Sequence, residues 1–132
     1  MDKVKEFFIK KGISLDEVLP GSGEVAFDCD TVNEAIELLR KNWVPILGGD
    51  VLTKDSFGKL RYAHSVLGPM YHGLSWYYES KRIDDIDGEG YVWRSYDYAT
   101  SAVHKALKVA NKLERDFYFL LVLDDVVEVD DD

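Results

Sequence analysis

The sequence has few of the residues that reaction chemistry, cross-linking or membrane insertion require. Its single cysteine, Cys29, excludes an internal disulfide framework, and we expect it to be a small, partly buried filler. No apolar run approaches the roughly 18–20 residues of a membrane-spanning helix. Residues 1–6 contain no apolar segment of the kind found in signal peptides. We therefore expect a cytoplasmic protein.

Catalytic and metal-binding motifs are also missing from the sequence. The three histidines, His64, His72 and His104, lack metal-ligand spacing, and no two of them lie four residues apart on a predicted helix. Neither Ser75 nor Ser95 stands in the glycine-flanked motif of a serine nucleophile. The sequence thus predicts no catalytic residue, no metal and no cofactor, and a protein that is not an enzyme.

Basic residues are outnumbered, which restricts the possible partners. The net charge is −9, and no basic residue follows Arg115. A chain with this charge repels nucleic acids and anionic membranes, so neither is an expected partner. It attracts a basic protein, although the same acidity can serve solubility alone.

What is present in the sequence indicates one folded domain. At 132 residues, of which 46% are apolar, the chain can bury a core without cross-links. We expect a single domain over 1–132 with an acidic C-terminal tail, 124–132. The patterns predict an α+β fold of two layers, in which two long helices pack on a small, mainly antiparallel sheet. The expected helices span 2–11, 28–43 and 89–113, the expected strands span 46–52, 60–62, 74–79 and 117–123, and 66–73 is an expected loop.

The first long helix, 28–43, has clear predicted boundaries. Thr31 and Glu34 stand three residues apart, as in a capping box at a helix start. Trp43 continues the apolar face of this helix by its spacing. Pro45 prevents the helix from extending, because proline lacks the N–H group that the next turn needs.

A double glycine interrupts the most apolar stretch of the first half of the chain, residues 43–52. Gly48 and Gly49 are followed at once by Asp50. Glycines inside a strand pattern indicate a bulge or the close approach of another backbone. We expect them to bend the strand under the second long helix. The alternative is a ligand-binding or enzymatic pocket at the bulge, where a break in the strand leaves backbone groups free.

Acids cluster directly before helix 89–113 and again at the C-terminal end. The first cluster excludes a calcium-binding loop, because the first ligand would be Ile83 and the last Arg94. Acids near a helix N-terminus are favoured by the helix dipole, which accounts for them without any partner. The alternative interpretation is an anionic patch that meets a basic protein.

Aromatic residues near these acids support the binding interpretation. Trp93 falls beside the apolar stripe of helix 89–113 and not on it. Exposed tryptophan next to acids is typical of hot spots in protein interfaces. The predicted contact residues are Asp84, Asp85, Asp87, Glu89 and Trp93, followed by Asp124 and Asp125.

Several motifs resemble one bacterial family. They are Ile-Leu-Gly-Gly-Asp-Val at 46–51, Ser75-Trp76-Tyr77, Tyr91-Val92-x-Arg94-Ser95, Ala99 and the strand 117–123. Together they resemble the immunity protein 40 family of polymorphic toxin systems. The resemblance implies a non-catalytic cytosolic inhibitor that neutralises a cognate toxin domain, with Gly48, Gly49, Asp50 and Trp76 as its structural motif. It also implies a basic toxin, such as a nuclease.

Three functions are open at this point. The first is an immunity protein that binds a toxin through an acidic and aromatic surface. The second is a small ligand-binding domain or enzyme with a pocket near Gly48 and Gly49. The third is an adaptor that associates with itself through helix 89–113. The charge clusters and the resemblance favour the first.

Overall fold

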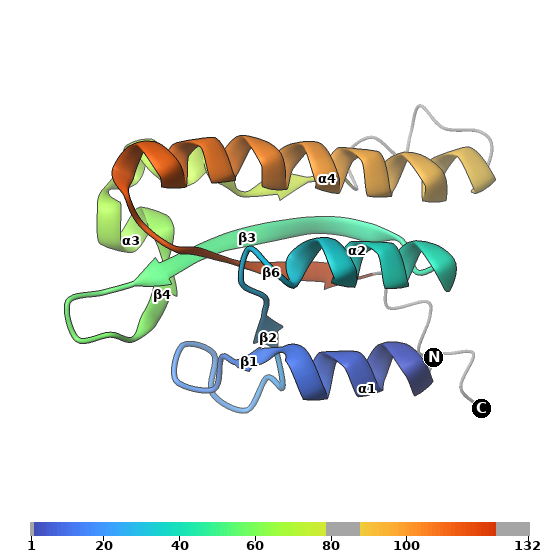
Figure 1. The fold of residues 1–132 in the computed structure, drawn as a ribbon, viewed down its shortest axis with the longest axis horizontal. Coiled ribbons are helices and arrows are strands. Elements are labelled where there is room, and N and C mark those ends of the chain that lie inside the picture. Colours follow the sequence, from blue (N-terminus) through green and yellow to red (C-terminus); the bar gives the residue numbers. More distant parts are fainter. Residues whose placement is uncertain (1, 79–87, 124–132) are drawn as a thin grey trace.

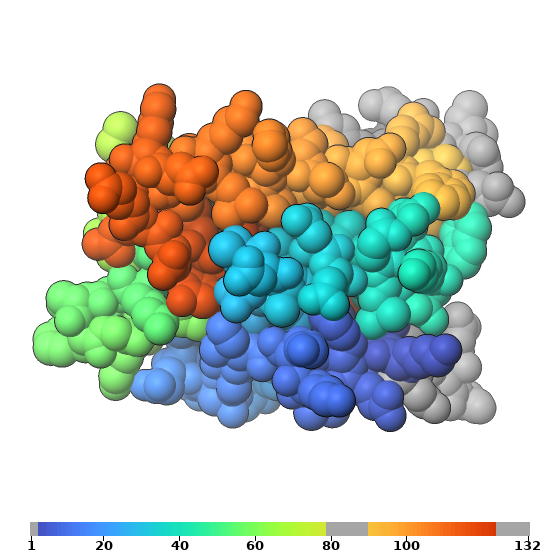
Figure 2. All heavy atoms as spheres, viewed as in Figure 1, coloured from blue at the N-terminus to red at the C-terminus, as the bar shows by residue number. Residues whose placement is uncertain are grey.

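The computed structural model describes residues 2–78 and 88–123. Three helices, α1, α2 and α4, lie roughly side by side along the long dimension of the molecule, over a sheet built around the strand β3 (Figure 1). Their atoms form one continuous surface on this side, in the order α4, α2, α1 (Figure 2). The helical layer and the sheet are therefore the two main layers of the fold.

The described residues form five helical segments and six strands. The helices are α1 (Asp2–Lys11), α2 (Val32–Lys41), α3 (Ala63–Leu67), the 3-10 helix η1 (Pro69–Leu74) and α4 (Gly88–Leu113). The strands are β1 (Ile13–Ser14), β2 (Val25–Ala26), β3 (Ile46–Lys54), β4 (Leu60–Tyr62), β5 (Trp76–Tyr77) and β6 (Phe117–Leu123). The α+β class with antiparallel pairing is confirmed. The prediction of two long helices is wrong, because α4 has 26 residues and α2 only 10.

Helix α2 is short because both of its ends are fixed by local hydrogen bonds. At the start, Asp28 Oδ1 accepts hydrogen bonds from the Thr31 backbone N–H at 2.9 Å and the Thr31 hydroxyl at 2.8 Å. Thr31 itself makes no side-chain cap, so the predicted capping box is wrong. Asp28 takes that place because its carboxylate accepts from the N–H groups of Asp30 and Thr31, in the turn that leads into the helix.

The end of α2 is a Schellman motif. Val44 N–H donates to the Leu39 carbonyl at 3.0 Å, and Trp43 N–H donates to the Arg40 carbonyl at 3.3 Å. Trp43 stands at the position that usually holds glycine, and its φ of 57° is left-handed. The prediction that Trp43 continues the apolar face of the helix is therefore wrong, because the chain has already left the helix there.

Strand β3 is the centre of a four-stranded antiparallel sheet. It pairs along its length with β6 and, on the other edge, with β4 near Leu52 and with β5 at Gly48 and Gly49. The register with β6 shifts between Ile46 and Gly48, so the bulge lies just before the double glycine. On the far edge of β6, Phe119 and Phe27 exchange two backbone hydrogen bonds of 2.8 Å.

Residues 66–73, expected as a loop, are largely helical. Helix α3 ends at Leu67, and η1 begins at Pro69. Gly68, with a φ of 120°, separates the two helical segments. Proline fits the first position of a helix because its missing N–H would have no partner there. The Gly-Pro pair thus joins two helical turns instead of marking a loop.

The sheet buries apolar side chains on both faces. On the face toward the helices, β3 and β6 contribute Val51, Phe117, Phe119 and Leu121 to the main core. On the opposite face, Leu15 packs with Leu52, Tyr118 and Leu120 in a smaller cluster. The segment that carries Leu15 and Leu19 therefore covers part of the second face of the sheet.

Candidate partner-binding surface

Most of the predicted contact residues lie outside the part of the chain that the structure describes. These residues are Asp84, Asp85, Asp87, Asp124 and Asp125, together with the side chain of Glu89. Their role in binding stays a prediction. Trp93, on the second turn of α4, is described and is 44% exposed.

Trp93 forms an exposed aromatic pair with Trp43, which is itself 49% exposed. Their ring centroids are 5.6 Å apart, with an interplanar angle of 78°, the edge-to-face arrangement that aromatic rings favour. The C-terminal end of α2 and the N-terminal part of α4 lie at the same end of the molecule, which brings the two residues together (Figure 1). We call Trp43, Trp93 and the neighbouring Arg40 the tryptophan patch.

Arg40 is the charged residue of the tryptophan patch, and it contacts both Trp93 and Glu37. Its guanidinium carbon lies 5.4 Å from the centroid of the Trp93 ring, within range of a cation–π interaction. Arg40 Nε also donates to Glu37 Oε2 at 3.0 Å. The hydrogen bond from Arg40 lowers the pKa of the Glu37 carboxyl. Arg40 is thus held between an acid and an indole before any partner arrives.

Tyr96 anchors the tryptophan patch to the core. Its ring packs edge-on against Trp93, with the centroids 6.3 Å apart, and its hydroxyl donates to the Leu39 carbonyl at 3.3 Å. Burial raises the pKa of the Tyr96 hydroxyl, which therefore stays protonated as a donor. This contact joins α4 to α2 directly beneath the exposed rings.

Trp43 lies on the surface, contrary to the prediction from its spacing. Its helical spacing matched the core face of α2, but the Schellman motif turns it outward. Pro45 was the available signal, because it disfavours a helical conformation at the residue before it and so moves the helix end toward Trp43. Trp93 was placed correctly beside the apolar stripe.

Gly48, Gly49 and Trp76 form a structural contact in the sheet. A Cβ atom on Gly49 would lie 2.2 Å from Cη2 of the Trp76 indole, and one on Gly48 would lie 2.5 Å from the Trp76 carbonyl oxygen. The expected close approach is therefore confirmed. The expected break is not present, because both glycines pair with β5 and β6. The pairing occupies the backbone groups that a ligand pocket would have needed.

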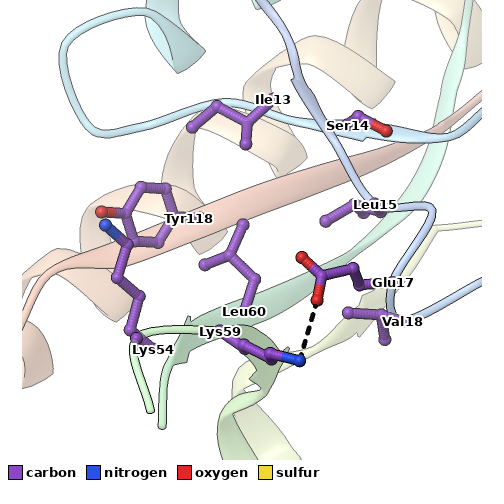
Figure 3. Close-up of a pocket in the computed structure, with 10 residues that line it drawn as sticks. Ile13, Ser14, Leu15, Glu17, Val18, Lys54, Lys59, Leu60 and Tyr118 are labelled. Carbon is purple, nitrogen blue, oxygen red and sulfur yellow. Dashed lines mark ion pairs between the residues drawn. The ribbon is translucent and has the colours of Figure 1, made fainter.

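Two hollows lie among the described residues. One, of about 200 Å³, lies between residues 13–18 and the turn after β3 (Figure 3). Glu17 and Lys59 both line it and form an ion pair of 3.2 Å. The other, of about 420 Å³, lies between α4 and residues 73–77. Its lining includes Trp76 and Tyr77, the strand partners of the double glycine, together with Tyr98, Ser101 and Lys105 from α4. Neither is lined by Gly48, Gly49 or Asp50.

The described residues contain neither a metal-ligand cluster nor a membrane-spanning helix. Within 2–78 and 88–123, no three His, Cys, Asp or Glu side chains come together as a metal site would require. No helix in the same ranges has the length and apolar character to cross a membrane.

Comparison with known proteins identifies the family. The model of the immunity protein 40 family matches residues 14–123, which is most of the chain. The chain belongs to this family. No curated protein and no solved structure matches the chain. Membership of the immunity protein 40 family points to a protein that inhibits a toxin, not to an enzyme.

Proposed function

We propose that this protein is a cytoplasmic immunity protein that binds a cognate toxin domain and blocks it by occupying its surface. Family membership gives the class of partner. The observation that supports direct protein binding is the tryptophan patch, where two half-exposed indoles meet a fixed guanidinium. Tryptophan and arginine are the residues most enriched in interface hot spots.

The backbone of Trp43 strengthens this proposal. A left-handed conformation costs a residue other than glycine about 1–2 kcal/mol. The edge-to-face contact with Trp93 offsets part of that cost, but about half of the Trp43 side chain stays exposed. Backbone strain is often kept where it serves a function. A partner that buries the Trp43 ring would supply the compensating interaction.

The toxin we propose is basic, such as a nuclease whose cleft normally binds phosphates. The net charge of −9 supports rapid association with such a domain. Asp84, Asp85, Asp87 and Glu89, with Asp124 and Asp125, remain proposed contacts. An acidic partner can fill a phosphate-binding cleft without performing any chemistry of its own.

We expect the adjacent open reading frame to encode the cognate toxin domain. The test uses that domain, with binding measured by biolayer interferometry and protection measured by co-expression. Trp43→Gly removes the indole and relieves the backbone, so we expect stability within about 1 kcal/mol of the parent. Binding should nevertheless weaken by roughly 30-fold, the loss of a typical hot spot. Trp93→Ala should weaken binding similarly.

Two matched controls accompany these variants. Glu114 occupies the same position after α4 that Trp43 occupies after α2, with a φ of 53°, so Glu114→Gly makes the same backbone change at the other end of α4. Phe57→Ala removes an aromatic ring that is 85% exposed elsewhere. Both should bind like the parent. If both tryptophan variants also bind and protect like the parent, the patch is not the interface; if the parent itself neither binds nor protects, the proposed function is wrong.

A further inference from the structure

The described residues cover only part of the sheet face opposite the helices. Leu15 and Leu19, from the segment before β2, pack over Leu52 and Tyr118 near the middle of the sheet. Toward the start of β3 the cover ends, and Tyr77 is 74% exposed and Val122 39% exposed. We call the part formed by Asp50, Tyr77 and Val122, with the buried Gly48 between the last two, the open sheet end.

The strand registers place Asp50 inside this open sheet end. Gly48 pairs with both Tyr77 and Val122, so each of these residues is a diagonal neighbour of Asp50 on the same face. Diagonal neighbours lie roughly 7–8 Å apart, within reach of a long side chain. Trp76 lies in the core on the helix side, so alternation along β5 directs Tyr77 to the open side.

The Asp50 carboxylate is half-buried, and no cation pairs with it among the described residues. Aspartate is disfavoured in strands, and a partly buried charge without a counter-ion costs further free energy. Tyr62 pairs with Leu52 and is therefore another diagonal neighbour of Asp50. Burial, and then the charges of Asp50 and Glu24, raise the pKa of the Tyr62 hydroxyl. Within 2–78 and 88–123, the Asp50 charge therefore has no cationic partner, and aromatic side chains are its neighbours.

We propose that the open sheet end binds an arginine of the toxin, with Asp50 as its counter-ion and Tyr77 against its guanidinium. This inference rests on the proposed function and adds the chemistry of a second contact, apart from the tryptophan patch. Arginine fits better than lysine, because its planar guanidinium can pair with a carboxylate and stack on an aromatic ring at once. The apolar surface of Val122 would accept the methylene groups of the same side chain.

The experiment compares Asp50→Asn with Glu6→Gln against the same toxin domain. Glu6 is exposed on α1, so its variant removes one negative charge without touching the open sheet end. Losing a hydrogen bond to a charged group should weaken binding by about 10–100-fold for Asp50→Asn. Glu6→Gln should bind within about twofold of the parent, since it changes only the net charge.

A second measurement does not depend on any variant folding. In the 15N-labelled parent, addition of the toxin domain should shift the amide signals of Asp50, Tyr77 and Val122. The inference is overturned if Asp50→Asn, shown to be folded by its thermal melt, binds as tightly as Glu6→Gln. It is equally overturned if those three amides do not shift. If either result occurs while the Trp93→Ala variant loses binding, only the arginine site is refuted and the proposed function is still supported. A parent that does not bind the toxin refutes both.

Discussion

At the scale of single residues, Gly49 carries the most specific structural information. It lies on the helix side of β3, where the Trp76 indole rests on the strand itself. The indole fills the space between the sheet and α4 because Gly49 adds no side chain of its own. The sequence predicted that some group comes close to this backbone. It could not identify Trp76 as that group, because Trp76 lies 27 residues after Gly49 and the two meet only through strand pairing.

Gly49→Ala should destabilise the fold. The added methyl group would meet three atoms of a rigid, buried ring at 2.2–2.6 Å, so either β5 or the indole must move. Overpacking of this kind costs about 1–3 kcal/mol, measurable as a lower free energy of unfolding in urea. Gly73→Ala is the control, because a Cβ atom there meets nothing within 4 Å. Equal stabilities for the two variants would contradict the proposed packing.

At the scale of elements, the helices and strands with long, uniform sequence patterns were predicted well, and the short helices were predicted poorly. Helix α4 keeps one apolar face through residues such as Ala99, Val103 and Ala106, and β6 is a continuous apolar run. Each signal is long enough to fix the type of element. Helices α3 and η1 have five and six residues, so they depend on their surroundings more than on periodicity. The end of α2 depends on the left-handed backbone conformation of Trp43, which the pattern of apolar side chains does not reveal.

The start of α2 offers a direct test of the correct cap. Asp28→Ala should lower the free energy of unfolding by about 1 kcal/mol, because the Asp28 carboxylate accepts the bonds at the helix start. Glu34→Ala should have a smaller effect, since no side-chain cap involves Thr31 and Glu34. Chemical denaturation of both variants distinguishes the two caps. A larger loss for Glu34→Ala would restore the capping box.

At the scale of the whole molecule, the class of fold and the family could be inferred from the sequence, but the candidate surface could not. The tryptophan patch needs α2 and α4 side by side, and the open sheet end needs the registers of three strands. Both arise from tertiary pairing between distant segments. Within the tryptophan patch, the sequence predicted only Trp93 as exposed, because its position follows from the period of one helix.

The placement of the three tryptophans makes the protein its own optical probe. Trp76 is buried, and its indole N–H has no hydrogen-bond partner among the described residues, so its emission should lie at short wavelengths. Trp43 and Trp93 are half-exposed and should emit at longer wavelengths. A partner that covers the pair would shift only the long-wavelength component, whereas unfolding would shift the short-wavelength one. A single emission spectrum can therefore separate the occupied state, the free state and the unfolded state without any label.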